Sequence, residues 1–521
     1  MTSDKTWEDV IETLQEKQGQ AMLGGGQERQ EKLRSKGLLT ARERIDYLLE
    51  PSSFVELNML AEHQCHDFGM ENKKFAGDGV ITGFGKIDGR DVYIFSEDQT
   101  VLGGSTGKTH GEKIHYVLRL ARENMKPVIG LYASAGARIQ EGMDNVYGIT
   151  GMFLQNSLNS GIVPQIAAIM GDCTGGAAYS PALCDFILQV KKTAHVFITG
   201  PAVIREVTGE QVTFEELGGA GMHSTKSGVV HLTAEDDRQC LDKIKALLRY
   251  LPQNNTEKPP FLESDDPADR EVPELVDIVP IKMNKTYDVK KVIRTIADHG
   301  DFYEIHEKFA PNAVVGFCRM GGQVLGIVAN NPKIIGGCLN VDASDKTARF
   351  IRTCDAFNIP LLTLVDVPGF MPGLNQEERG IIRHGAKMLY AWAEATVPKV
   401  SVILRKMYGG SIPAMGVHEI GFDQVFAWPS AEMQMLGAVP AVRILYRKEL
   451  KAAEDPEALF DEKIKEYQDA YMTPYHSASR QVIDAVIYPK ETRKRLISTF
   501  AMLATKAAVP RQPRKHGNIP L

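Results

Sequence analysis

The stretch Gln165-Ile-Ala-Ala-Ile-Met170, which leads to Gly175-Gly176-Ala177-Ala178, decides the fold because it has a counterpart in the other half of the chain. That counterpart is Lys399-Val-Ser-Val-Ile-Leu404, which leads to Gly409-Gly410-Ser411. Each apolar run predicts a buried strand, and the glycines that follow it predict a turn at the strand exit. Gly409 stands 234 positions after Gly175, and a duplication would give further matches at about this spacing.

The two halves match in an ordered series of glycines, prolines and one lysine. At an offset of 233 the pairs are Gly83-Phe84 with Gly316-Phe317, Gly89 with Gly322, Gly103-Gly104 with Gly336-Gly337, Lys113 with Lys346, Pro127 with Pro360 and Gly136 with Gly369. Pro164 and Pro398 continue the series at 234, so one inserted residue relates the halves. Chance gives isolated coincidences but not an ordered series. The series therefore predicts a structural duplication.

Each half repeats one pattern of strands and helices. Two β-rich runs precede a Gly-Gly turn, an amphipathic helix (113–124; 346–358), a buried strand and a glycine loop, and then a second helix and a second apolar strand. This alternation predicts an α/β layered domain in each half. Residues 252–273 are rich in Pro, Asn, Asp and Ser, which is typical of a linker, and we expect domains at 1–260 and 261–521.

Composition excludes several classes of protein. The 521 residues include 60 Lys+Arg and 66 Asp+Glu, and this net charge of −6 is unlike that of a nucleic-acid binder. No apolar run reaches the roughly 18 residues of a membrane span, and the polar N-terminus is no signal sequence, so we expect a cytoplasmic protein without membrane insertion. Seven scattered cysteines without a CxxC pair indicate reduced thiols. His63-Gln64-Cys65-His66 lacks a second ligand group at suitable spacing, so no metal is expected.

The two glycine turns are the strongest candidates for chemistry. If a helix starts at each, its first N–H groups lack partners within the helix and point outward, which makes an oxyanion hole of backbone alone. The candidates are Gly175, Gly176 and Ala177 in the first half, and Gly409, Gly410 and Ser411 in the second. A lone Gly-Gly is better interpreted as a tight turn, but its recurrence at equivalent places favours the site.

Two such holes imply two carbonyl oxygens that gain negative charge, and a thioester and a urea-like carbonyl such as that of biotin are natural candidates. Side-chain catalysts are hard to find, and no GxGxxG motif occurs. The stretch 103–109 lacks the gap of a Walker loop, and His231, His384 and His418 are isolated and better interpreted as structural.

Several further segments carry a family resemblance. They are Ser134-Ala-Gly-Ala-Arg-Ile-Gln-Glu-Gly142, Phe197-Ile-Thr-Gly-Pro201, Glu216-Leu-Gly-Gly219, Asn340-Val-Asp-Ala-Ser-Asp-Lys346, Val365-Asp-Val-Pro-Gly-Phe370, Ile381-Ile-Arg-His-Gly-Ala-Lys387 and Arg405-Lys406. With the two glycine turns, they make the chain resemble the carboxyltransferase (beta) subunits of biotin-dependent acyl-CoA carboxylases, from about Gly24 to about Arg495. These subunits include those of propionyl-CoA carboxylase, methylmalonyl-CoA carboxyltransferase and methylmalonyl-CoA decarboxylase.

The resemblance implies two crotonase-like domains, each a spiral of ββα units, and a homohexamer with active sites between subunits. It implies acyl-CoA on the N-terminal half and biotin on the C-terminal half of a neighbour. The biotin would be carried by a biotin carboxyl carrier on another chain and served by a separate biotin carboxylase, since neither a Met-Lys-Met context nor an ATP-grasp region occurs here. Substrate contacts are expected at Ala135, Gly136, Arg138, Ile412 and Pro413.

Three points stay open at this stage. Arg138 is placed to reach the CoA phosphates, but pairing with Glu141 explains it equally well. Pro413 and Pro440 depart from the family pattern and lack a backbone N–H, so the acyl specificity stays open. We expect that biotin still binds. We also expect that Ile412 and Pro413 leave a small acyl pocket.

The third open point is the reaction itself. The leading hypothesis is carboxyl transfer between carboxybiotin and a short acyl-CoA, most naturally propionyl-CoA or methylmalonyl-CoA. The runner-up is the carboxyltransferase subunit of a sodium-pumping methylmalonyl-CoA decarboxylase, which sequence does not separate from the first. A biotin-independent crotonase-like enzyme would need a Glu pair near 175–178, where none stands. A non-catalytic scaffold becomes the better reading if the prolines close the biotin pocket.

Overall fold

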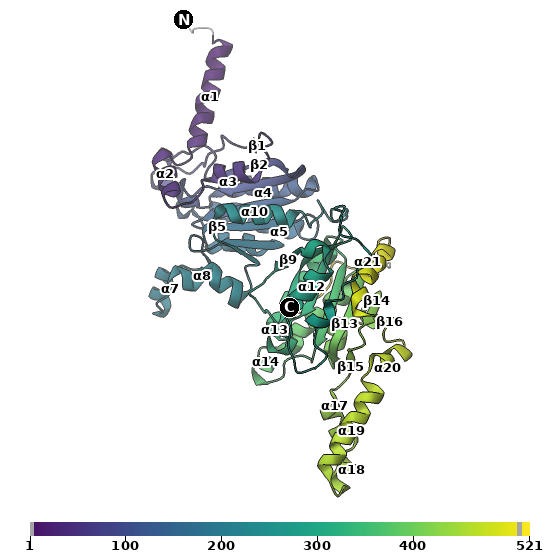
Figure 1. The fold of residues 1–521 in the computed structure, drawn as a ribbon. Helices are drawn as coiled ribbons and strands as arrows, with labels where there is room; N and C mark the ends of the chain where they lie inside the picture. Colours follow the sequence, from purple (N-terminus) through teal and green to yellow (C-terminus); the bar gives the residue numbers. More distant parts are fainter. Residues whose placement is uncertain (1–4, 508–512) are drawn as a thin grey trace. The chain divides into compact units, whose positions relative to one another are not determined.

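The computed structural model describes residues 5–507 and 513–521, in two compact units that meet in sequence between Glu257 and Lys258. Each unit is built on its own eight-stranded sheet with helices packed against it (Figure 1). The segment from 252 to 274 contains neither helix nor strand, as its composition predicts. Within the described residues, none of the helices combines the length and apolar character needed to cross a bilayer.

The sheet of the first unit runs in the order β1-β2-β3-β4-β5-β6-β8, and β7 pairs with β5 beside that path. The first three strands are antiparallel, and the pairs from β3 onward are parallel. The strands are β1 (Val55–Leu57), β2 (Val80–Ile87), β3 (Arg90–Glu97), β4 (Val128–Ser134), β5 (Gln165–Thr174), β6 (Phe186–Val190), β7 (Val196–Phe197) and β8 (Leu232–Ala234).

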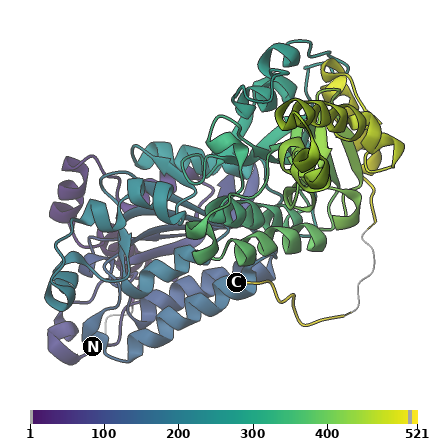
Figure 2. The ribbon, with the colours of Figure 1, turned by 90° about the horizontal axis from the view of Figure 1, so that it is seen from below.

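The helices of the first unit begin and end where local chemistry dictates. Thr6 and Thr40 each form a capping box, with Asp9 and Glu43 respectively. Helices α4 and α5 lie side by side along the sheet (Figure 2). The helices are α1 (Trp7–Leu23), α2 (Gln27–Ser35), α3 (Ala41–Leu48), α4 (Lys108–Glu123), α5 (Asp144–Asn159), α6 (Tyr179–Ala182), α7 (Pro201–Thr208), α8 (Phe214–Gly218), α9 (Ala220–Met222) and α10 (Asp237–Leu248), with 3₁₀ turns η1 (Asp67–Asn72), η2 (Leu102–Gly104), η3 (Ile139–Glu141) and η4 (Gly175–Ala178) and a π-helical turn η5 (His223–Ser227).

The sheet of the second unit repeats the first strand for strand. Its order is β9-β10-β11-β12-β13-β14-β16, with β15 beside β13 where the first unit has β7 beside β5. The strands are β9 (Phe302–Ile305), β10 (Ala313–Met320), β11 (Gln323–Asn330), β12 (Leu361–Val367), β13 (Lys399–Tyr408), β14 (Gln424–Ala427), β15 (Glu432–Gln434) and β16 (Ala485–Val486). The predicted fold class, two copies of one α/β spiral, is confirmed.

Helices of the second unit bury one face against this sheet; in α12, for example, Val289, Val292, Ile293 and Ile296 are fully buried. Helices α17 to α19 extend away from the body of the unit (Figure 1). The helices are α11 (Leu275–Ile278), α12 (Val289–Ile296), α13 (Val341–Ala356), α14 (Leu374–Glu378), α15 (Ile381–Glu394), α16 (Ser411–Met415), α17 (Ala438–Leu445), α18 (Arg447–Ala452), α19 (Pro456–Tyr471), α20 (Pro474–Ser479) and α21 (Thr492–Leu503), with 3₁₀ turns η6 (Asp298–Gly300), η7 (Ile335–Gly337), η8 (His418–Ile420) and η9 (Pro489–Glu491).

The matched lysines have one structural role in both units. Lys113 Nζ donates to the carbonyls of Gly77 and Val80, at 2.9 and 2.5 Å. Lys346 Nζ donates to four carbonyls, those of residues 306, 309, 310 and 313. Burial lowers the pKa of Lys113 to about 8 and that of Lys346 to about 7. Each lysine therefore fastens the loop that enters the β-hairpin.

Candidate functional site

The first glycine turn begins where β5 ends. Gly175 has φ 59°, a left-handed conformation that side chains with a Cβ rarely adopt, and the 3₁₀ turn η4 starts there. Its N-cap residue, Thr174, makes no side-chain hydrogen bond to the start of this helix, so the first N–H groups are uncapped. A Cβ on Gly176 would lie 3.2 Å from Cγ2 of Ile149, so helix α5 packs closely against this turn.

The second glycine turn repeats this construction at the end of β13. Gly409 also has φ 59°, and α16 starts at Ser411 without a side-chain cap. Ser411 is buried, and its hydroxyl donates to the carbonyl of Tyr408 at 2.5 Å. The hydroxyl is therefore used within the turn, and the Gly409 N–H donates to the Gln434 carbonyl at 3.1 Å. The backbone N–H groups of Gly410 and Ser411 are the donors to consider there.

The two prolines that depart from the family pattern stand in first turns of helices. Pro413 is the third residue of α16, and Pro440 is the third residue of α17. N–H groups in a first turn have no partner within the helix, so proline removes no helical hydrogen bond at these places. Ile412 is half-buried, and its N–H donates to the Gly409 carbonyl at 3.0 Å.

The loops after the preceding strands reach these turns in both units. A Cβ on Gly136, which has φ 88°, would lie 2.8 Å from the carbonyl oxygen of Thr174. In the second unit a Cβ on Gly410 would lie 3.6 Å from the ring of Phe370, which follows Gly369. The structure therefore brings together, within each unit, the glycine loop and the glycine turn that the sequence singled out.

The N–H groups of the first loop are largely used within the unit. Ala135 N–H donates to the Gly103 carbonyl at 3.1 Å, although the residue itself is exposed. Gly136 N–H donates to Oγ of Ser134 at 3.2 Å. Donors for a ligand are thus better supplied by the uncapped turn at 175–177 than by this loop.

Arg138 corrects one sequence-based expectation. Its side chain is 1% exposed and binds Asp78 Oδ1 at 2.6 Å and Glu141 Oε1 at 2.8 Å. A third bond goes to the carbonyl of Ser105 at 2.8 Å. Because its donors are taken by these partners, Arg138 does not present a cation to CoA phosphates here, and the alternative of pairing with Glu141 is the one that the structure shows.

Asp366 and Arg405, which lie in segments that carry the family resemblance, form an ion pair. Arg405 Nε donates to Asp366 Oδ2 at 2.7 Å, and both side chains are fully buried. Asp366 stands where the register between β12 and β13 shifts, and its Oδ1 accepts the N–H of Lys406 at 3.3 Å. The pair therefore joins the two strand ends that lead to Gly369 and Gly409. A buried-charge signal of this kind is visible only in three dimensions.

The isolated histidines have structural partners. His231 Nδ1 accepts the N–H of Ile187 at 3.3 Å, His384 binds Asp345 at 2.7 Å, and His418 lies 3.2 Å from Asp484. His63 Nε2 lies 2.9 Å from the carbonyl oxygen of Lys73. Among residues 5–507 and 513–521, no three His, Cys, Asp or Glu side chains are grouped to hold a metal ion.

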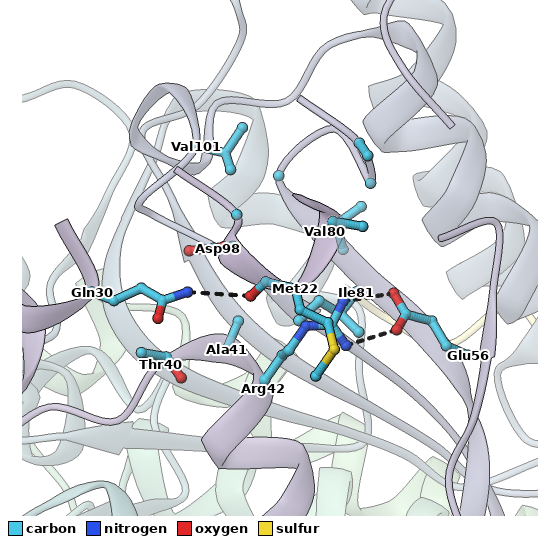
Figure 3. A pocket seen from close by; sticks show the side chains of 15 residues that line it. Met22, Gln30, Thr40, Ala41, Arg42, Glu56, Val80, Ile81, Asp98 and Val101 are labelled. Atoms are coloured by element: carbon cyan, nitrogen blue, oxygen red, sulfur yellow. Dashed lines mark hydrogen bonds and ion pairs between the residues drawn. The ribbon is translucent and has the colours of Figure 1, made fainter. Parts of the chain in front are cut away.

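Two hollows lie elsewhere in the first unit. One, of about 20 Å³, is lined by residues of the first three helices and β2, and the Arg42–Glu56 ion pair at 2.7 Å forms part of its wall (Figure 3). That volume holds about one water molecule. The other, of about 400 Å³, lies between residues 64–67 and the first turns of α4 and α5.

Two repeats of one α/β spiral, each with an uncapped glycine turn, define a duplicated crotonase-like protein. The chain belongs to the family of the carboxyl transferase domain, whose family model matches residues 32–519. The resemblance inferred from the sequence is thereby confirmed.

Similar proteins cover the chain from end to end. It is 52% identical to a propionyl-CoA carboxylase carboxyltransferase subunit from Haloferax mediterranei, over 99% of this chain and 100% of that one. It is 50% identical to the methylmalonyl-CoA decarboxylase subunit alpha of Veillonella parvula, with the same two coverages. A crystal structure of transcarboxylase 12S, a hexamer with methylmalonyl-coenzyme A and methylmalonic acid bound, matches with a TM-score of 0.97 and 50% identity over the whole of both chains.

Proposed function

We propose that this chain is a carboxyltransferase subunit that moves a carboxyl group between carrier-bound carboxybiotin and a short acyl-CoA, with propionyl-CoA and methylmalonyl-CoA as the pair. The observation that carries this proposal is end-to-end identity of about one half with relatives named for these two thioesters. The two matched glycine turns, one per unit, supply the local chemistry that such a transfer needs.

The first unit takes the acyl-CoA thioester in this proposal. The backbone at Gly175, Gly176 and Ala177 faces the thioester oxygen and stabilises the negative charge that it gains. Fixed backbone dipoles in a dry site stabilise such charge strongly, because they need no reorganisation during the reaction. No side chain has to ionise for this to work.

The second unit takes biotin, with Gly409, Gly410 and Ser411 facing the ureido oxygen. Bound carboxybiotin supplies the carboxyl group and, at its ring nitrogen, the proton acceptor. The residues fit this group through the backbone N–H groups of Gly410 and Ser411, since the Ser411 hydroxyl and the Gly409 N–H are occupied. Ile412 and Pro413 form an apolar, stiff wall beside the turn, which favours a short acyl chain.

The proposal includes partners that this chain does not supply. The biotin carrier and the biotin carboxylase belong to other chains, and no metal on this chain takes part. We propose a cytoplasmic homohexamer whose active sites lie between copies, supported by the hexamer described for transcarboxylase 12S.

A second candidate is favoured by the methylmalonyl-CoA decarboxylase relative, which is 50% identical. The chemistry on this subunit would be the same in the opposite direction. Purification of the native complex separates the two: a biotin carboxylase that co-purifies supports the first candidate, and a membrane subunit that requires sodium supports the second.

Decarboxylation with free biotin tests the shared proposal. Purified protein is given free biotin and malonyl-, methylmalonyl- or glutaconyl-CoA, and loss of the carboxyl group is followed. We expect methylmalonyl-CoA to be the best of the three and the rate to depend on biotin. Equal rates with and without biotin, or no turnover of any thioester, would exclude the proposal.

Chain-length selection tests the wall at Ile412 and Pro413. We expect propionyl-CoA to outcompete longer acyl-CoA thioesters in the wild type, and this preference to weaken in Pro413→Asp. If longer thioesters win in the wild type, the pocket is not small and this part of the proposal is wrong.

A further inference from the structure

A chain of buried charged side chains lies beneath the Ala135–Gly136 loop of the first unit, and the reaction as proposed makes no use of it. Its members are Asp78, Glu97, His110, Arg138 and Glu141. The first four are at most 1% exposed, and the Glu141 side chain is 5% exposed. Burying so many charges is costly unless each is paired, so their presence calls for a role.

One end of this network holds the end of β4. Glu97 Oε2 accepts the N–H of Ala133 at 2.7 Å, at the point where the register between β4 and β5 shifts. Glu97 Oε1 lies 3.4 Å from His110 Nε2. His110 Nδ1 lies 3.0 Å from the carbonyl oxygen of Asp78, and the His110 N–H donates to Asp78 Oδ2 at 3.0 Å.

The other end holds the loop itself. Arg138 bridges Asp78 and Glu141, and Glu141 Oε2 in turn accepts the N–H of Lys108 at 2.7 Å. The N–H of Arg138 donates to the Thr106 carbonyl at 2.9 Å. The loop that carries Gly136 is thus tied on both sides, to the end of its own strand and to the start of α4.

The second unit provides an internal comparison, because it forms the same loop without these charges. Asn330, the counterpart of Glu97, accepts the N–H of Asp366 at 3.4 Å, as Glu97 accepts that of Ala133. The other counterparts at the 233 offset are Pro311 for Asp78, Ala343 for His110, Met371 for Arg138 and Leu374 for Glu141. The strand order and the glycine turns are alike in both units, so the fold does not require the network.

We infer that Glu97, His110, Asp78, Arg138 and Glu141 are positioning residues that fix the Gly136 loop against the Gly175 turn for binding of the acyl-CoA thioester. This inference rests on the proposed function. Paired charges in a dry interior interact strongly and in fixed geometry. The buried pair of the second unit, Asp366 with Arg405, lies at the strand ends, whereas the network of the first unit also reaches Arg138 and Glu141, beyond Gly136. Only the unit assigned to the thioester carries them.

The test replaces charge without removing shape. Asp78→Asn/Arg138→Met neutralises one buried pair together and places the second unit's residue at 138. At 78 it puts an amide of the same shape in place of the carboxylate, where φ is 47° and Asn is tolerated. Arg138→Lys is the conservative variant. Arg119→Met is the matched control, because Arg119 forms an exposed pair with Glu123 on α4.

Two readouts are measured on the full-length protein. The first is decarboxylation of methylmalonyl-CoA with free biotin; the second is hydrogen exchange at residues 133–142, with 366–375 as the internal reference. In the double variant we expect kcat to fall about 10- to 100-fold, since small misplacements of a preorganised site have effects of this size. The KM for free biotin should stay within about twofold, and exchange at 133–142 should rise while that at 366–375 does not. Arg138→Lys should regain part of the rate, and Arg119→Met should match the wild type.

Each other outcome has a definite meaning. Unchanged exchange at 133–142 in a folded double variant overturns the inference, as does an equal rise in both segments. A lower melting temperature with wild-type kcat shows a merely structural role and also overturns it. If the double variant does not fold, the same criteria are applied to Arg138→Lys and Glu141→Gln. A wild type inactive with every thioester rejects the proposed function, whereas the exchange data still decide whether the loop is held by these charges.

Discussion

Gly176→Val is the sharpest perturbation of the first glycine turn. The new Cβ would lie 3.2 Å from Cγ2 and 3.4 Å from Cδ1 of Ile149, closer than ordinary carbon contacts. Either Ile149 or the turn must therefore shift by a few tenths of an ångström, and the two γ-methyl groups add further bulk beside the uncapped N–H groups. A shift of the turn moves the donors away from the thioester oxygen.

The expected loss follows from the value of one preorganised donor. Removing a donor from an oxyanion hole costs about 10²- to 10³-fold in turnover, which corresponds to about 3–4 kcal/mol. We expect a loss of this size in kcat for methylmalonyl-CoA decarboxylation with free biotin. Adding Ile149→Val, which shortens the neighbour, should recover part of the rate if the clash displaces the turn.

The equivalent change in the second unit serves as the matched control. A Cβ on Gly410 would meet the Phe370 ring at 3.6 Å, an ordinary contact, so Gly410→Val should fold well. It should raise the KM for free biotin and leave the affinity for propionyl-CoA, measured by calorimetry, unchanged. Wild-type kcat in folded Gly176→Val, or an effect of that variant on biotin alone, would refute the assignment of the thioester to the first unit.

Three further predictions concern stability. Lys346 has a pKa of about 7 in the folded protein and about 10.5 in the unfolded chain, so unfolding between these pH values takes up a proton. The free energy of unfolding should therefore rise with pH across this range. Lys346→Met should reduce this pH dependence in urea unfolding from pH 7 to 9. Arg44→Met should destabilise by about 3–5 kcal/mol, because Asp237, 2.9 Å from Arg44 and 2% exposed, is left buried and unpaired; Arg44→Met/Asp237→Asn should recover much of the loss in the same unfolding assay. Thr40→Ala should lower the free energy of unfolding by about 1 kcal/mol, because it removes the N-cap of a helix that is buried at Ala41, Ile45 and Leu48. Thr6→Ala removes the N-cap of the exposed helix α1 and should lower the melting temperature less. Equal effects of the two variants would argue against a role for burial.

The sequence predicted the duplication and the places of both glycine turns because glycine marks backbone that other residues rarely adopt. Gly175 and Gly409 have the same φ of 59°, and this shared conformation explains why the pair survives at equivalent positions. The helices and strands around them follow apolar periodicity, which is a local property of the chain.

The partners of charged side chains were not predictable in the same way. Arg138 has Glu141 three residues away, which the sequence offered, and Asp78 sixty residues away, which it did not. The Ser411 hydroxyl donates to the Tyr408 carbonyl, and nothing in the sequence indicates this partner. Long-range pairing of this kind depends on how strands and loops meet, and a single sequence contains no direct signal for it.

Every described strand pairing stays within one unit, and this has a consequence for how the protein is made. The last strand of the first sheet ends at Ala234, so that sheet is complete before the ribosome has begun the strands of the second. At roughly 5–20 residues per second, synthesis of the second unit takes roughly 10 to 50 s. The first unit thus has time to fold alone on the ribosome. Its strands can pair with one another before the similar strands of the second unit exist.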